Sequence, residues 1–217
     1  MKVVDLGHMA YRPCADLQAQ LLERVAAGEE DNSLIFVEHD PVLTLGAGFH
    51  PENLLLPREE YEARGIAIEP TNRGGDVTYH GPGQLVLYPI FRLDVVGRDL
   101  HKWMRALEDT MIETVGSFGL AGARKPSGAA SESSVLTGCW VEDRKVAAIG
   151  VKVRRWTSMH GIALNCNLDL AVFDLFVPCG IRDFGVTSLS LELGREVSID
   201  EAKSSVLSAF EEVFATA

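Results

Sequence analysis

The chain has 217 residues, of which 47% are hydrophobic and 24% charged, and its formal net charge is −11. This composition is typical of a globular protein and excludes disordered, collagen-like and coiled-coil classes. The length fits a single domain over residues 1–217, and the acidic balance argues against a nucleic-acid partner. No apolar stretch approaches the roughly 20 residues that cross a bilayer, and the first residues show no signal-peptide pattern. We therefore expect a cytoplasmic protein with no membrane partner.

Three segments have the apolar spacing of a helix. The first runs through Leu17–Val25, where Gly28 is available to end it. The second lies near residues 99–116, where apolar residues recur at intervals of four. The third begins at Ser198-Ile199-Asp200-Glu201, which has the pattern of a capping box.

Five segments between the helices predict strands, because they are rich in apolar and β-branched residues and are bounded by Gly, Pro, Asn or Asp. They are Leu34–Val37, Gln84–Phe91, Val135–Val141, Lys145–Arg154 and Gly161–Leu168. Residues 142–144 are expected to form a hairpin tip, and residues 121–134 a mobile loop. Antiparallel strands in a run, with helices before and after, predict an α+β fold whose mixed or antiparallel sheet is flanked by helices and covered on one side.

The most unusual run is Arg73-Gly74-Gly75-Asp76-Val77-Thr78-Tyr79-His80-Gly81-Pro82-Gly83-Gln84. Its glycines are poor material for a packed helix or strand, and they let the backbone approach a ligand closely. The run is neither a Walker loop nor a dinucleotide fingerprint. Two interpretations follow: a ligand-facing loop, or a tight turn that leads into the next strand.

The cysteines Cys14, Cys139, Cys166 and Cys179 lack metal-type spacing and are expected to be free thiols. Cys179 differs from the others because it lies between a proline and a glycine, which leaves room for a substrate. A thiol with a pKa of roughly 8.5 needs a nearby cation or base to become a reactive thiolate. The candidates are His80, His160, Lys145 and Lys152. The alternative is that Cys179 is structural.

Strand alternation predicts that Lys145 shares a face with Ala147, Ile149 and Val151, with Lys152 on the opposite face. Lys145 then either reaches solvent or sits in a pocket. The runs His80-Gly81 and His160-Gly161 repeat one pattern and can bracket one cleft. Neither histidine has a carboxylate or thiol at ligand spacing, so we expect no metal site.

Several of these blocks resemble the signature of the lipoate–protein ligase B family of octanoyltransferases. They are Arg73-Gly74-Gly75, Thr78–Gln84 and Tyr88-Pro89, with Glu38–Val42, Thr44–Gly46, Lys145–Gly150, His160–Asn165, Pro178–Gly180 and Gly185–Leu189. The blocks follow in order from about residue 34 to the end. The resemblance implies the α+β fold shared with biotin and lipoate protein ligases.

The resemblance also implies site residues. The catalytic pair would be Cys179 and Lys145. The substrate cleft would use Arg73, Gly74, Gly75, Asp76, Val77, Thr78, Tyr79, His80, Ala148, Ile149, Gly150, Gly161, Ile162 and Ala163. No metal and no cofactor are implied.

The implied reaction moves an octanoyl group from octanoyl-acyl carrier protein to Cys179, and then to a lysine ε-amine, as the first step of protein lipoylation. Lys145 would act as acid and base. The implied acceptors are lipoyl domains of 2-oxoacid dehydrogenase E2 subunits and the glycine cleavage H protein. ATP is not required, because a thioester is already activated. The alternatives are an ATP-dependent lipoate or biotin-type protein ligase on the same fold, a thioesterase, and a non-catalytic acyl-binding protein.

Charge is unevenly distributed along the chain. Residues 121–160 contain seven Lys or Arg against three Asp or Glu. Arg124, Lys125, Arg154 and Arg155 are therefore candidates for a patch that docks an acidic carrier protein. A solvated strand face is the alternative.

Overall fold

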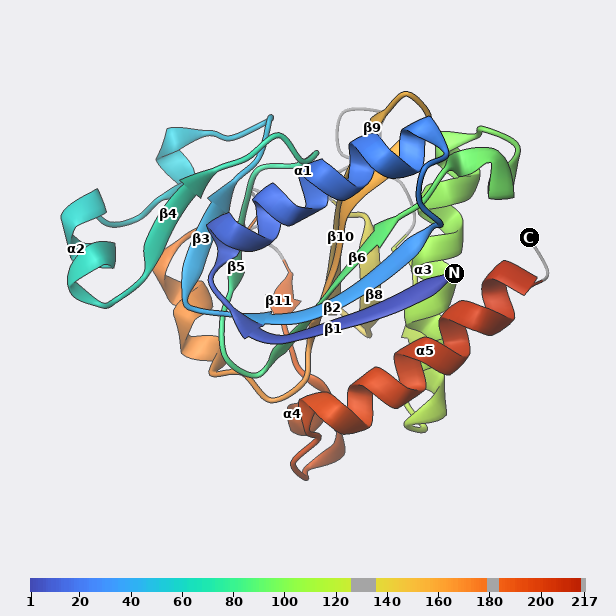
Figure 1. The fold of residues 1–217 in the computed structure, drawn as a ribbon. Helices are drawn as coiled ribbons and strands as arrows, with labels where there is room; N and C mark the ends of the chain where they lie inside the picture. The colour runs from blue at the N-terminus through green and yellow to red at the C-terminus, as the bar shows by residue number, and fades with distance from the viewer. Residues whose placement is uncertain (126–135, 179–183, 216–217) are drawn as a thin grey trace.

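The computed structural model describes residues 1–125, 136–178 and 184–215 (Figure 1). Cys179 and Gly180 therefore lie outside the described residues. So do Val135, where one strand was expected to begin, and most of the loop expected over 121–134. Among the described residues, no helix is long and apolar enough to cross a membrane.

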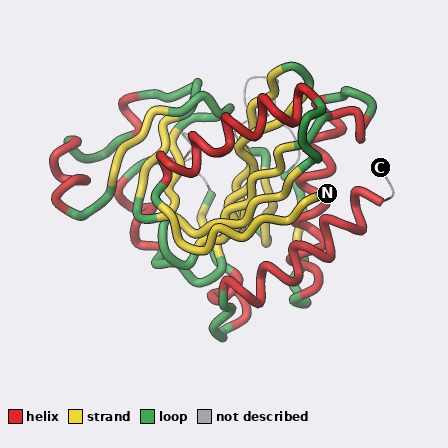
Figure 2. The backbone as a smooth tube through the Cα atoms, viewed as in Figure 1, coloured by secondary structure: helices red, strands yellow, loops and turns green. Residues whose placement is uncertain are grey.

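The main sheet has the strand order β1-β2-β6-β10-β9-β8-β7, with β11 paired to β9. Figure 2 shows the strands in yellow and the helices around them in red. In that order the bounds are Lys2–Met9, Ser33–His39, Gln84–Ile90, Thr157–Asn165, Arg144–Arg154, Gly138–Val141 and Gly122–Ala123, with Gly185–Val186 for β11. β1 runs parallel to β2 and β11 parallel to β9, whereas the other pairs are antiparallel. The predicted mixed sheet is confirmed.

Helices cover both faces of this sheet, so the expectation of a sheet covered on one side is wrong. Helices α3 (Leu100–Ser117) and α5 (Ile199–Ala215) pack on one face around Trp103 and Phe210. Helix α1 (Tyr11–Ala27) crosses the other face, where Leu22 and Ile35 belong to a second core (Figure 1). The physical reason is that the central strands β6 and β10 are buried along their whole length, so neither face can be left to water.

A second sheet, with the order β4-β3-β5, lies beside the first (Figure 1). Its strands are β3 (Val42–Leu45), β4 (Ala67–Pro70) and β5 (Val77–His80), and its core also includes Tyr61 of helix α2 (Arg58–Ala63). The sequence did not predict this sheet, because each strand has only four residues. In the described part of the chain, the remaining helical elements are the 3₁₀ turns Pro51–Asn53, Leu93–Val96 and Leu170–Leu175, and helix α4 (Leu189–Leu193).

The three predicted helices are confirmed with shifted ends. Helix α1 begins at Tyr11, earlier than its periodic core, and ends at Gly28 in a left-handed conformation. The capping box is half formed: the Ser198 hydroxyl accepts from the backbone N–H of Glu201 at 3.2 Å, but the Glu201 carboxylate pairs with Arg195 instead of reaching back. An arginine within reach therefore outcompetes the reciprocal bond.

The close approach of β6 and β10 depends on Gly161, where an added Cβ would collide with the backbone oxygen of Leu87. We expect Gly161→Ala to lower the free energy of unfolding by about 1–3 kcal/mol, as overpacking does in a closed core. Gly116→Ala is the matched control, because that exposed glycine in α3 has nothing within 4 Å of an added Cβ. It should stabilise the protein by about 0.5–1 kcal/mol. Urea titration of both variants measures the difference, and an unaffected Gly161→Ala would contradict the packing argument.

Candidate active site

A cavity of about 510 Å³ lies against β9 and β10, between the loop at Arg73–Gly75 and helix α3. This volume falls in the range of about 300–1,000 Å³ that is usual for small-molecule sites. Most of the predicted cleft residues line it: Arg73, Gly74, Gly75, Thr78, His80, Ala148, Ile149, Gly150, Gly161, Ile162 and Ala163. The structure thus brings together segments that lie far apart in the sequence.

Three predicted cleft residues do not line the cavity. Strand alternation in β5 turns Val77 and Tyr79 into the core of the small sheet, away from Thr78 and His80. The buried Asp76 carboxylate accepts hydrogen bonds from the His50 backbone N–H at 3.0 Å and from the Asn53 side chain. Asp76 therefore anchors the segment that follows β3.

Arg73 shapes the glycine-rich loop. Its side chain is 6% exposed, and its guanidinium donates to the backbone oxygens of Thr44 at 2.6 Å, Asp76 at 2.8 Å and Gly74 at 3.0 Å. The loop also packs closely against the residue after β3, because an added Cβ at Gly46 would collide with the backbone oxygen of Gly75. A buried cation held by several carbonyl oxygens fixes the loop against β3.

The loop also meets strand β9. The Gly74 N–H donates to the Val151 oxygen at 2.9 Å, and a Cβ at Gly150 would lie 3.0 Å from the Gly74 oxygen. The two glycines let the loop lie along the strand and form one wall of the cavity.

Lys145 reaches the cavity because β9 contains a bulge. Trp140 of β8 pairs with Lys145, and Cys139 pairs with Ala147, so Val146 is an extra residue. Val146 and Ala147 both enter the core, whereas Lys145 and Ala148 line the same cavities. The expectation that Lys145 shares a face with Ala147 is therefore wrong.

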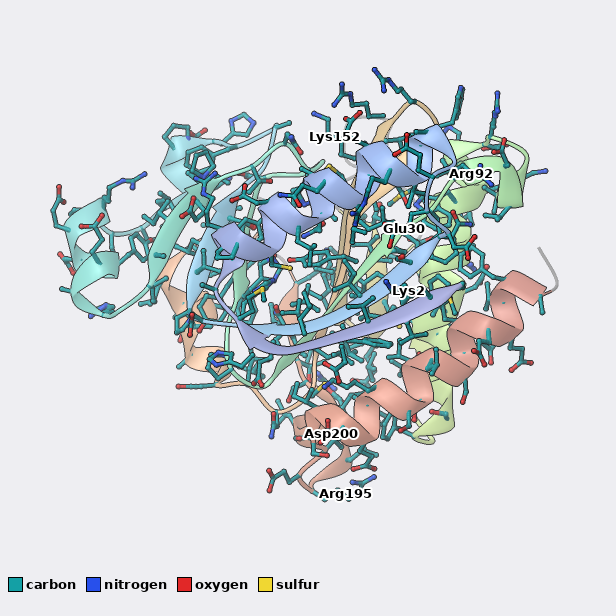
Figure 3. All side chains as sticks on the ribbon, in the orientation of Figure 1. Lys2, Glu30, Arg92, Lys152, Arg195 and Asp200 are labelled. Carbon is teal, nitrogen blue, oxygen red and sulfur yellow. The ribbon has the colours of Figure 1, made fainter. Side chains whose placement is uncertain are left out.

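The same bulge corrects the position of Lys152. Alternation beyond Ala148 places Lys152 on the face of Lys145, not on the opposite face as expected. It lies near the tip of the β9–β10 hairpin (Figure 3), roughly 20 Å farther along the strand. Lys152 does not line the cavity.

The amine of Lys145 is buried, with 9% of the residue exposed, and its Nζ lies 4.8 Å from the ring centroid of Trp140. This distance is that of a cation–π contact. Lys145 also lines a smaller cavity of about 40 Å³ that is shared by Trp140 and Pro178. One residue that lines this small cavity, Pro178, directly precedes the predicted nucleophile Cys179 in the sequence.

Besides His101 of α3, the main cavity is lined by His80 of β5 and His160 of β10. His80 stacks on Tyr11, and its Nδ1 lies 2.8 Å from Gln84 Oε1. His160 has a φ of 58°, and its Nε2 lies 2.9 Å from Asn72 Oδ1. The expectation that the two His-Gly runs bracket one cleft is confirmed. Burial lowers the pKa of His80 to about 3 and the pKa of His160 to about 4, so both rings are neutral at pH 7.

The described cysteines are structural. Cys14, Cys139 and Cys166 are buried free thiols, and burial raises their pKa values to about 11, 12 and 12. None of them lines either cavity. Thiols in such surroundings are inert.

The four residues of the expected basic patch do not form one patch. Arg154 and Arg155 both pair with Glu23 of α1. Arg124 pairs with Glu108 and Asp109 of α3, and Lys125 lines the main cavity. Of these four residues, only Arg124 and Lys125 therefore lie beside the candidate site.

The sequence analysis missed the α3 wall of the cavity. It consists of Leu100, His101, Met104, Arg105 and Glu108. No motif marks these residues, and their only signal is a spacing of four along the predicted helix, which also fits an ordinary packed face.

Comparison with known proteins agrees with the family resemblance of the sequence motifs. The family model described as "Lipoyl protein ligase A/B catalytic domain" matches residues 10–211. The chain is 44% identical to an octanoyltransferase of Geobacter metallireducens, covering 97% of this chain and 92% of that one. It is 43% identical to an octanoyltransferase of Flavobacterium johnsoniae, with coverages of 99% and 96%.

Solved structures share the fold at low sequence identity. A putative lipoate protein ligase of T. acidophilum, with bound lipoic acid, superposes with a TM-score of 0.75 at 16% identity, over 99% of this chain and 86% of that one. A biotin protein ligase from Aquifex aeolicus superposes with a TM-score of 0.55 at 12% identity, over 100% and 69%.

The chain belongs to the family of lipoyl protein ligase A/B catalytic domains. Within that family it groups with the octanoyltransferases, which are acyltransferases that serve protein lipoylation.

The buried neutral histidines predict a pH dependence of stability. An unfolded histidine binds a proton near pH 6.5, whereas folded His80 does so only near pH 3, so its contribution is complete above pH 6.5 and is lost as the pH falls toward 3. Between pH 7.5 and 5.0, His80→Gln should lose about 2 kcal/mol less unfolding free energy than the wild type. The control His50→Gln, at a side chain that is 66% exposed, should lose as much as the wild type. Urea titration at both pH values is the measurement; equal losses in all three proteins would contradict a neutral His80.

Proposed function

We propose that this chain transfers an octanoyl group from octanoyl-acyl carrier protein to the ε-amine of a lysine on lipoyl domains. The acceptors would be lipoyl domains of 2-oxoacid dehydrogenase E2 subunits and the glycine cleavage H protein. The names of the curated relatives support octanoyl transfer, and the donor and acceptors follow from the resemblance in the sequence. Residues 1–217 would act as one catalytic domain in the cytoplasm, without metal or cofactor.

One observation carries this proposal: the buried residue Lys145 lines both the main cavity and the small one beside Pro178. A cavity with apolar side chains such as Ile149, Ile162 and Met104 in its walls suits an acyl chain, and a buried amine beside it suits proton transfer. Cys179, the residue after Pro178, would be the nucleophile. The bulge that turns Lys145 toward both cavities supports its role, because regular alternation would place this side chain on the core face with Ala147.

The reaction would take place in two steps. In the first, the Cys179 sulfur attacks the thioester carbonyl, the donor's C–S bond breaks, and the octanoyl group becomes a thioester on Cys179. Lys145 takes the thiol proton and returns it to the departing donor thiolate. In the second, the lysine amine attacks the new thioester, a C–N bond forms, the C–S bond to Cys179 breaks, and the amine proton passes through Lys145 to the departing Cys179 sulfur.

The remaining predicted residues that line the cavity would form the substrate cleft. Arg73 would act indirectly, since its guanidinium is engaged by the loop that it shapes. Apolar side chains at Ile149, Ile162 and Ala163 would contact the octanoyl chain. Gly150 and Gly161 would leave space for it.

Cys179→Ser should abolish the covalent octanoyl adduct, because an alcohol is a far weaker nucleophile than a thiolate. Cys14→Ser, Cys139→Ser and Cys166→Ser are the matched controls and should keep the adduct wherever the protein folds. Intact-mass spectrometry after mixing with octanoyl-acyl carrier protein is the measurement. Full transfer by Cys179→Ser would overturn the assignment, and ATP–pyrophosphate exchange would favour a ligase instead.

Lys145→Arg should lose most of the transfer rate, because arginine keeps the positive charge but does not accept or release protons near neutral pH. Lys152→Arg should remain near the wild-type rate, since Lys152 lies at the opposite end of β9 from Lys145 and does not line the cavity. Single-turnover octanoyl transfer to a lipoyl domain from pH 6 to 9 checks both variants. A fully active Lys145→Arg would mean that a fixed cation suffices.

A further inference from the structure

A chain of side-chain amides starts at a backbone oxygen and ends at His80. Asn165 Nδ2 donates to the Thr187 oxygen at 2.9 Å, and Gln84 Nε2 donates to Asn165 Oδ1 at 3.0 Å. Gln84 Nε2 also donates to the Tyr79 oxygen at 3.1 Å. Because a carbonyl oxygen only accepts, these contacts fix which end of each amide is nitrogen.

The orientation of the Gln84 amide determines the tautomer of His80. With Nε2 of Gln84 engaged as a donor, its Oε1 faces His80 Nδ1 at 2.8 Å and must accept a hydrogen bond. The proton of the neutral ring therefore sits on Nδ1, and Nε2 has a free lone pair. Within the described part of the chain, no residue hydrogen-bonds to that Nε2.

The network joins the two cavities. His80 lines the large cavity, whereas Gln84 and Asn165 line the small one together with Lys145. The backbone N–H of Thr187 also donates to the Lys145 oxygen at 3.0 Å. One set of hydrogen bonds thus positions both the His80 ring and the strand that bears Lys145.

Once the carrier protein has left, the acyl-enzyme offers few groups that a bare acceptor can bind. An acyl chain has no hydrogen-bond donor, and a thioester carbonyl only accepts. The primary amine of the incoming lysine donates through its N–H groups while its lone pair attacks. An acceptor beside the amine orients that lone pair toward the carbonyl carbon.

We propose that His80 Nε2 accepts a hydrogen bond from the amine of the acceptor lysine in the second step, and that Gln84 and Asn165 are positioning residues that hold the ring in this tautomer. The inference rests on the proposed function above. His80 does not retain the proton: the C–N bond forms, the C–S bond to Cys179 breaks, and the proton passes through Lys145 to the sulfur.

Nitrogen-15 NMR of the ring nitrogens tests the tautomer without any turnover. At pH 7, His80 should show a protonated Nδ1 and a bare Nε2, and an unacylated lipoyl domain should move the Nε2 resonance. A lipoyl domain whose acceptor lysine is replaced by methionine should leave it in place. A protonated Nε2, or equal shifts with both domains, would overturn the proposal even if octanoyl transfer itself is confirmed.

The two half-reactions test the role of the contact. His80→Phe keeps a ring against Tyr11 and should slow transfer from the acyl-enzyme about tenfold or more, while formation of the acyl-enzyme changes less than about twofold. His50→Gln, at an exposed histidine, should change neither step. Equal slowing of both steps would overturn the amine contact, and absence of any acyl-enzyme in the wild type would instead overturn the proposed function.

Gln84→Glu is the second variant, and it guards against misfolding of His80→Phe. A carboxylate opposite Nδ1 favours the imidazolium and raises the pKa of His80. The other groups facing the ring are Tyr11, His39, Arg73 and His160, and none of them changes. Transfer by this variant should fall as the pH drops from 9 to 6, since a protonated Nε2 cannot accept, whereas the wild type shows no such loss from His80. Identical pH profiles would contradict the positioning role of Gln84.

Discussion

Strand β9 carries one residue more than β8 between Lys145 and Ala147, and the candidate site depends on that residue. If Val146 were paired as a regular strand residue, alternation would place Lys145 on the same face as Ala147, among the apolar side chains that pack against α3 and α5. A lysine amine buried there would lack polar partners and would cost several kcal/mol. The bulge lets the strand fill the core with two consecutive apolar residues and still present the amine to the cavity. Bulges next to active sites commonly re-aim a side chain in this way.

The polar side chains that the strands and the glycine-rich loop turn toward the cavity include Arg73, His80 and His160. The Arg73 cation is held by backbone oxygens, and burial keeps His80 and His160 uncharged. Burial penalises a charged histidine here and the Arg73 cation repels it, so the pKa of each ring is lowered and the neutral form predominates. The two histidines therefore add no charge to the cavity at neutral pH.

The sequence predicted the large elements well and the small ones poorly. Helices with sustained spacing, such as 99–116, and long apolar strands such as Gln84–Phe91 were located to within a few residues, because periodicity reports burial directly. The three four-residue strands of the small sheet gave no such signal. Register was the other failure: the bulge at Val146 depends on pairing with β8, which no pattern within β9 reveals.

The same contrast holds for the candidate site. The glycine-rich loop and both His-Gly runs were found because glycine clusters are unusual in packed elements. The α3 wall, including Leu100 and Met104, was missed because its spacing is that of any buried helix face. The orientation of the Gln84 and Asn165 amides follows only from the full set of hydrogen bonds, which a sequence does not contain.

The contact between Gly74 and Val151 has a consequence for solubility. Within the described residues, the pairing of β8 with β9 ends at Ala148, so the rest of β9 has no partner strand along that edge. An open edge of this kind is a template for strands of other molecules and promotes aggregation. The glycine-rich loop covers it through the hydrogen bond to the Val151 oxygen. A segment that forms the wall of a binding cavity thereby also protects the sheet from pairing with its neighbours in a crowded solution.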